Sequence, residues 1–130
     1  RRIRFAKCLF LGTIPVIISI LLQKWFQIFG PFEYLNGLVT FYLKQIDPSQ
    51  GYAGLFNNPN YAGLWLSASL PFCFLMLKIY KYKKLKLSFI IAIIISMIYC
   101  ILSTNSRNSF IGIVIASFIM MSTKLLFTFL

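Results

Sequence analysis

Residues 87–102 read LSFIIAIIISMIYCIL and contain no charged side chain. A run of this kind is typical of a helix that crosses a lipid bilayer, because about 20 apolar residues span the hydrocarbon core. The chain holds further runs of this type, and we expect membrane spans over residues 8–23, 61–77, 87–103 and 110–124. The sequence therefore predicts an all-α fold, a polytopic integral membrane helical bundle that forms one domain over residues 1–130.

The composition of the whole chain favours the same class. Of its 130 residues, 59% are hydrophobic and 12% are charged, and the mean hydropathy is +0.82. Soluble domains are nearer half apolar and about a quarter charged. The chain starts at Arg1 without a methionine and stops inside an apolar segment, so we expect an internal fragment of a larger membrane protein. A signal peptide is the other interpretation of the first run, but it lacks a small-residue cleavage site.

The net charge of +11 is distributed unevenly along the chain. Nine of the thirteen basic residues form two clusters that flank apolar runs: Arg1, Arg2, Arg4 and Lys7, and then Lys78, Lys81, Lys83, Lys84 and Lys86. This is the pattern of cytoplasmic membrane loops, which also attract anionic lipid headgroups. A nucleic-acid surface would need a basic face on a soluble domain, so we expect membrane lipids as partners and no nucleic acid.

The segment at 25–47 is mixed in character. Its apolar residues recur at helical spacing, which predicts an amphipathic helix lying in the membrane interface. A count of membrane crossings agrees that this segment lies in the interface and does not span the bilayer. Both basic clusters lie on the same side of the membrane only if an even number of spans separates them. The spans at 8–23 and 61–77 give two. Residues 57–60 and 104–108 then share the opposite, non-cytoplasmic face.

The first of these two polar patches is GLFNNPNYAG at residues 54–63. Asn58 can cap a helix with Pro59 at its first position, or Asn60 can cap a helix that begins at Tyr61. In either case, free backbone N–H groups at the helix start favour anions. An ordinary capped helix start is the alternative interpretation.

The second patch is TNSRN at residues 104–108. The Arg107 guanidinium offers a bidentate fork that suits phosphate oxygens, and hydroxyl and amide groups surround it in the sequence. The alternative is a short polar turn whose arginine touches lipid headgroups.

The chain has no histidine, and its three cysteines lack metal-ligand spacing, so we expect no metal site and no cofactor. The residues alone favour a phosphorylated ligand.

The segment at 54–63, Pro71 within the following run, and LSTNSR at 102–107 together resemble the O-antigen ligase and O-antigen polymerase superfamily. In that family, a segment of the form G-x-F-x-N-P-N-x-x-A opens one membrane helix, and T-x-S-R opens a helix two crossings further on. The resemblance covers about residues 51–117. Family members commonly carry an arginine at the place of Gly51, and ligases use a histidine in a later loop.

The resemblance implies a GT-C-like glycosyltransferase in the bacterial inner membrane, active in polysaccharide biosynthesis for the cell envelope. Such enzymes transfer a glycan from a polyprenyl-diphosphate carrier to lipid A core, a growing polysaccharide or a protein on the periplasmic side, without a metal. Arg107 would stabilise the departing diphosphate. We expect further substrate contacts from Gly54, Asn58, Asn60, Tyr61 and Ser106. The larger protein would be the active enzyme, and the fragment alone would be inactive.

Two other function classes remain open. A membrane transporter for bicarbonate or another small anion would also break its helices with polar residues, but nearer mid-span. A non-catalytic structural membrane subunit predicts no clustering of polar residues. The sequence beyond residue 130 would distinguish them, since a long polar loop with histidine and arginine favours the transferase.

Overall fold

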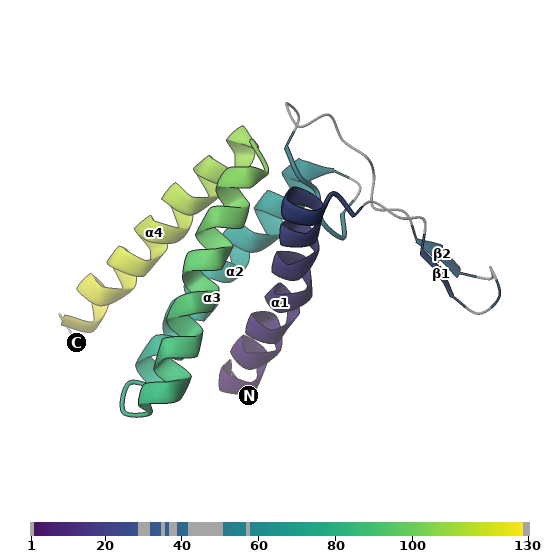
Figure 1. Ribbon diagram of the computed structural model, residues 1–130. Helices are drawn as coiled ribbons and strands as arrows, with labels where there is room; N and C mark the ends of the chain where they lie inside the picture. Colours follow the sequence, from purple (N-terminus) through teal and green to yellow (C-terminus); the bar gives the residue numbers. More distant parts are fainter. Residues whose placement is uncertain are drawn as a thin grey trace.

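The computed structural model describes residues 2–28, 32–34, 36, 39–41, 51–56 and 58–128, with side chains of the last helix described as far as Phe118. Its helices pack as a bundle (Figure 1). They are α1 (Arg2–Phe26), α2 (Pro59–Ile79), α3 (Lys84–Ser103) and α4 (Arg107–Thr128), and two short strands are β1 (Phe32–Tyr34) and β2 (Val39–Phe41). The four spans expected from the sequence fall within these four helices. The predicted helical membrane bundle is confirmed.

The helices have the length and composition of membrane spans. Three of them are long and apolar enough to cross a bilayer, over Ile3–Phe26, Pro59–Ile79 and Lys84–Ser103. A helix rises 1.5 Å per residue, so the 20 residues of α3 reach about 30 Å, the thickness of the hydrocarbon core. In α4, the part with described side chains, Arg107–Phe118, is a shorter apolar helix. The protein is membrane-embedded.

The start of α2 follows directly from its sequence. Asn58 has extended backbone angles, φ −141° and ψ 127°, and its side chain accepts a hydrogen bond from the Asn60 N–H at 2.8 Å. Pro59 occupies the first helical position, where its missing N–H costs nothing. The structure thus selects Asn58 as the cap and rules out a helix that begins at Tyr61 behind an Asn60 cap.

The amphipathic helix predicted over residues 25–47 is wrong for the described part of that segment. α1 ends at Phe26, and β1 and β2 pair antiparallel, with Phe32 opposite Phe41 and Tyr34 opposite Val39. Aromatic and β-branched residues favour strands, and Asn36 between them has a positive φ of 54°, which suits a turn. The prediction treated the apolar spacing as helical and overlooked this turn. An interfacial position for the segment stays a prediction.

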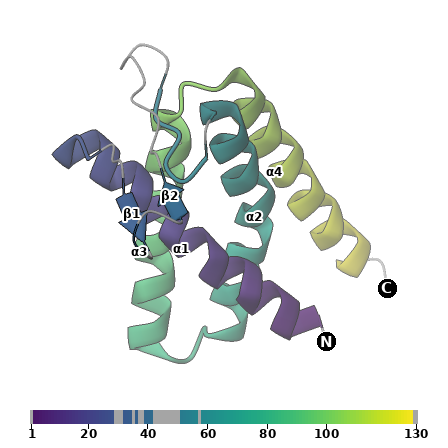
Figure 2. The ribbon, with the colours of Figure 1, turned by 90° about the vertical axis from the view of Figure 1, so that its right-hand side faces the viewer.

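Within the bundle, α2 packs against each of the other three helices, and α1 also packs against α3. Figure 2 shows α4 alongside α2, and α1 running obliquely across the bundle. The largest fully buried apolar side chains come from α1, α2 and α3: Ile20, Leu66, Met76, Met97 and Ile101. Small residues let α2 and α4 approach closely, since the Ser67 hydroxyl donates to the Ser109 carbonyl at 3.0 Å.

The two ends of the bundle differ in chemistry. At the end where α1 begins, the Lys7 ammonium lies 5.7 Å from the centroid of the Tyr80 ring, in the α2–α3 loop. We call this the basic end, because both lysine and arginine clusters meet there. At the opposite end, which we call the polar end, α1 finishes, α2 starts, and α3 turns into α4 (Figure 1). The expectation that the two clusters share one side is confirmed; which side of the membrane that is stays a prediction.

Candidate functional site

The two polar patches lie together at the polar end. The loop before α2 packs against the α3–α4 turn, because the Tyr52 N–H donates to the Ser103 carbonyl at 3.0 Å. Gly51, with φ +85°, approaches so closely that a Cβ there would overlap the Thr104 carbonyl. An arginine, which the resemblance expects at this position, would not fit. The two patches that the sequence placed on one face therefore lie at the same end of the bundle.

A second contact joins the first turns of α2 and α4. Gly63 packs directly onto Ser109, and a Cβ on Gly63 would lie 2.9 Å from the Thr104 hydroxyl. The Thr104 hydroxyl donates to the Ile101 carbonyl at 2.7 Å and lies 3.5 Å from the Ser109 hydroxyl. Both side chains are buried. These two hydroxyls are therefore buried inside the α3–α4 turn, packed against Gly63. The sequence suggested that they surround Arg107, but they are buried while Arg107 is exposed.

The loop is also fixed to α1. The Gln23 side chain accepts a hydrogen bond from the Gly54 N–H at 2.7 Å and donates to the Gly54 carbonyl at 3.4 Å, and the Ser19 hydroxyl accepts from the Leu55 N–H at 3.0 Å. Gly54 has φ +57°, and a Cβ there would lie 2.6 Å from the Ser19 hydroxyl. Gly54 is buried with its backbone groups occupied, so it positions the loop.

The other predicted site residues differ in exposure. Arg107 and Asn60 are exposed, and Tyr61 is 63% exposed. Asn58 is half-buried, with its side-chain oxygen occupied by the helix cap. Ser106 is buried, and its hydroxyl accepts from the Ser109 N–H at 3.3 Å, so it caps α4. The side chains that can reach a ligand directly are Arg107, Asn60 and Tyr61.

Lys24 is the functional candidate that the sequence did not identify. Its position after an apolar run suggested an ammonium extended outward into the headgroups. Instead Lys24 is half-buried and donates to the Ser103 hydroxyl at 2.8 Å, across 79 residues of sequence. Its ammonium also lies 4.4 Å from the Tyr99 ring centroid and 5.9 Å from that of Tyr52. Cation–π attraction and a hydrogen bond therefore hold the charge inside the polar end.

These residues line a cavity of about 300 Å³ between the end of α1, the loop before α2 and the end of α3. Its lining consists of Lys24, Tyr52, Tyr99, Leu102, Ser103 and Asn105. Trp25 borders it, since the indole N–H donates to the Tyr99 hydroxyl at 3.4 Å. One feature of the sequence pointed to this cavity. Lys24 and Trp25 stand side by side at the end of an apolar run, and Tyr52 and Tyr99 lie near the ends of other segments.

The polar end has the electrostatics of an anion site. α2 and α4 both begin there, so their positive dipole ends share one face of the bundle. Lys24 and Arg107 add two cations. Within the ranges that the structure describes, no group of three or more His, Cys, Asp or Glu side chains could hold a metal ion. Fixed positive charge at this end of the bundle favours an anion over a cation.

Comparisons with protein-family models, with curated proteins and with solved structures found no match for this chain. The fold and the site define a class: a helical membrane protein with a cationic, aromatic-lined site at the polar end of its bundle.

Proposed function

We propose that this chain is part of a membrane glycosyltransferase that transfers a glycan from a polyprenyl-diphosphate carrier to lipid A core, a growing polysaccharide or a protein. The observation that carries the proposal is the contact between the two motifs that resemble the O-antigen ligase and polymerase superfamily. The Tyr52 N–H to Ser103 carbonyl bond and the packing of Gly63 onto Ser109 join them at one end of the bundle. The α2–α3 hairpin brings residues 63 and 103 to the same end of the bundle, and these contacts show that the loop before α2 and the first part of α2 touch the α3–α4 turn there.

The chemistry of the carrier suits this end of the bundle. A diphosphate leaving group gains negative charge as the glycosidic bond breaks, and preorganised positive charge lowers the energy of that transition state. Arg107, exposed at the first residue of α4, can offer two parallel N–H donors to phosphate oxygens. Lys24 is held in the adjacent cavity by Ser103 and Tyr99 and adds a second cation. Neither role needs a metal or a proton transfer.

The charge distribution supports a periplasmic location for this site in a bacterial inner membrane. Loops rich in lysine and arginine stay on the cytoplasmic side of the membrane. Lys7 and Lys86 both lie within 6 Å of the Tyr80 ring centroid, so their clusters occupy the same end. If that end is cytoplasmic, the polar end faces the periplasm. A carrier lipid lying in the outer leaflet would then reach Arg107 from the side.

The test is glycan transfer from a polyprenyl-diphosphate donor in membranes that contain the larger enzyme of which we propose this chain to be part. Replacing Arg107 by alanine should lower the transfer rate by a factor on the order of 10², typical of removing one fixed electrostatic contact, while Arg107→Lys should keep part of the activity. Arg4→Ala is the matched control, because it removes an exposed arginine from the basic end. Transfer at the parental rate by Arg107→Ala, at equal protein levels, would refute the proposal.

A further inference from the structure

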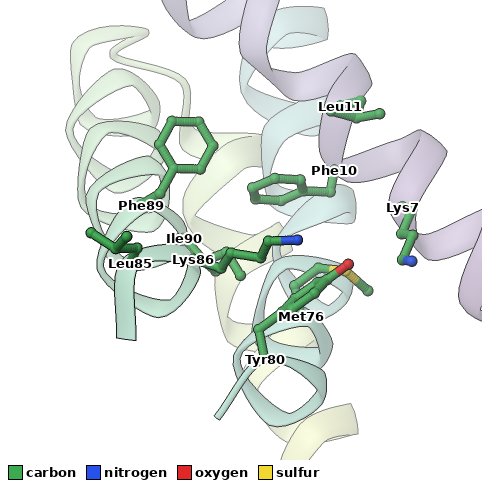
Figure 3. A pocket seen from close by; sticks show the side chains of 9 residues that line it. All are labelled: Lys7, Phe10, Leu11, Met76, Tyr80, Leu85, Lys86, Phe89 and Ile90. Atoms are coloured by element: carbon green, nitrogen blue, oxygen red, sulfur yellow. The ribbon is translucent and has the colours of Figure 1, made fainter. Parts of the chain in front are cut away.

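A second cavity lies at the basic end, away from the candidate site. It has a volume of about 400 Å³ and lies between the first part of α1, the end of α2 and the start of α3. Figure 3 shows the side chains around it. Most of the lining is apolar: Phe10, Leu11, Met76, Leu85, Phe89 and Ile90. Its polar groups are Lys7, Tyr80 and Lys86, so the cavity combines an apolar interior with a cationic rim.

The polar groups of this rim converge from three different elements. The ammonium groups of Lys7, in α1, and Lys86, in α3, lie 5.7 and 5.3 Å from the centroid of the same Tyr80 ring. Figure 3 shows the Tyr80 hydroxyl between the two ammonium groups. Hydrogen bonding to the Lys7 ammonium lowers the pKa of the Tyr80 hydroxyl, and the charges of Lys7, Lys86 and Lys83 act in the same direction. The field at this point therefore favours negative charge.

The chain has too few acidic residues to neutralise this field itself. It has thirteen lysines and arginines and two carboxylates, Glu33 and Asp47. Further positive charge comes from the α2–α3 loop and the helix ends that flank it: Lys78, Lys81, Lys83 and Lys84. Like charges held this close repel one another, so an anion from outside the chain would stabilise them.

The apolar side of the cavity carries side chains that are exposed on the surface of the bundle. Phe89 is 55% exposed and Leu11 is 59% exposed, and the two come from the helices on either side of the cavity. In a membrane-embedded bundle, such exposed apolar side chains contact acyl chains. A ligand that satisfies both parts of the site carries a phosphate and a long hydrocarbon chain. Inorganic phosphate would satisfy only the rim.

We propose that this cavity binds one anionic phospholipid of the leaflet at the basic end, with its phosphate beside the Tyr80 hydroxyl, in reach of Lys7 and Lys86, and an acyl chain between Phe10 and Phe89. The site is independent of the glycosyltransferase proposal, which concerns the opposite end of the bundle. Basic pockets between membrane helices bind anionic headgroups in this way. The lipid would join α1 to α3 at an end where the two helices carry repelling charges.

The experiment is native mass spectrometry of the delipidated protein with phosphatidylglycerol or with phosphatidylcholine of the same acyl chains. We expect one phosphatidylglycerol to be retained with about tenfold or greater preference over phosphatidylcholine. The double variant Lys7→Gln/Lys86→Gln should lose that preference. Its matched control, Lys78→Gln/Lys81→Gln, removes the same charge from the same end without touching the cavity lining and should keep the preference.

Three results would overturn the proposal. Equal retention of the two lipids by the unmodified protein would show that no anionic site exists. An equal loss in both double variants would show general attraction to the basic end without a site. Displacement of the bound lipid by millimolar inorganic phosphate would show a simple anion site. All four lysines are exposed, so circular dichroism should give the same helical content for both double variants and the parent.

Discussion

The closest approach between the two motifs, at Gly63, can be tested by adding a single methyl group. In Gly63→Ala, the Cβ would overlap the Ser109 hydroxyl and lie 2.8 Å from the Ser109 Cβ. Rotation of the serine cannot relieve the second contact, because its Cβ is fixed to the backbone of α4. The helices must therefore separate, which also weakens the Ser67 hydroxyl bond to the Ser109 carbonyl.

The expected size of the effect follows from these contacts. Overpacking costs about 1–3 kcal/mol, and the weakened hydrogen bond costs about 1 kcal/mol more. Alanine gains back about 1 kcal/mol over glycine inside a helix. Gly63→Ala should therefore lower the free energy of unfolding by about 1–3 kcal/mol. Gly12→Ala is the matched control, since its Cβ would meet only the Trp65 ring, at 3.8 Å.

The assay is equilibrium unfolding in mixed micelles with increasing sodium dodecyl sulfate, followed by far-ultraviolet circular dichroism. Gly12→Ala should be neutral or stabilising by up to about 1 kcal/mol, so the two variants should differ by about 1–4 kcal/mol. Adding Ser109→Gly to Gly63→Ala removes the overlapping side chain and should recover part of the loss. Equal stabilities for Gly12→Ala and Gly63→Ala would refute the close contact between α2 and α4.

Other predictions concern the helix cap, the topology and the polar-end cavity. Asn58→Ala should lower the free energy of unfolding by about 1 kcal/mol through loss of the α2 cap, and an unchanged midpoint in the same micelle titration would contradict the capping role. In a cysteine-free background, a membrane-impermeant thiol reagent should label Asn60→Cys but not Lys83→Cys in intact cells; labelling of both would overturn the topology. Lys24→Gln should weaken binding of a polyprenyl diphosphate by about tenfold or more, because one charge-assisted contact is lost. Unchanged binding would show that Lys24 serves only in packing.

The helices could be predicted from the sequence because they depend on local composition. Apolar runs long enough to cross a bilayer must satisfy their backbone hydrogen bonds internally, and a helix does so without reference to the rest of the fold. The Asn58 cap and Pro59 start of α2 are equally local. Segregated lysines and arginines likewise indicated that both basic clusters share one end, which the contacts of Lys7 and Lys86 with Tyr80 confirm.

The segment between α1 and α2 was harder to predict, because its apolar spacing fits a helix as well as a strand. The strand pairing of Phe32 with Phe41 depends on the turn at Asn36, whose positive φ the periodicity does not encode. In the site, Arg107 lies at a helix start, as the resemblance implied, while Gly54 and Ser106 proved to be positioned for packing and capping. The contact of Arg107 with a diphosphate stays a prediction.

The sequence by itself determined a helical membrane protein, the positions of α1, α2, α3 and α4 along the chain, and that both basic clusters share one end. Only the tertiary structure decided which side chains meet. Lys24 reaches Ser103 across 79 residues, and Gln23 holds Gly54 across 31. Such contacts depend on how each helix is rotated and how closely its neighbours approach. Helical spacing says which residues share a face, but packing between helices sets what that face touches.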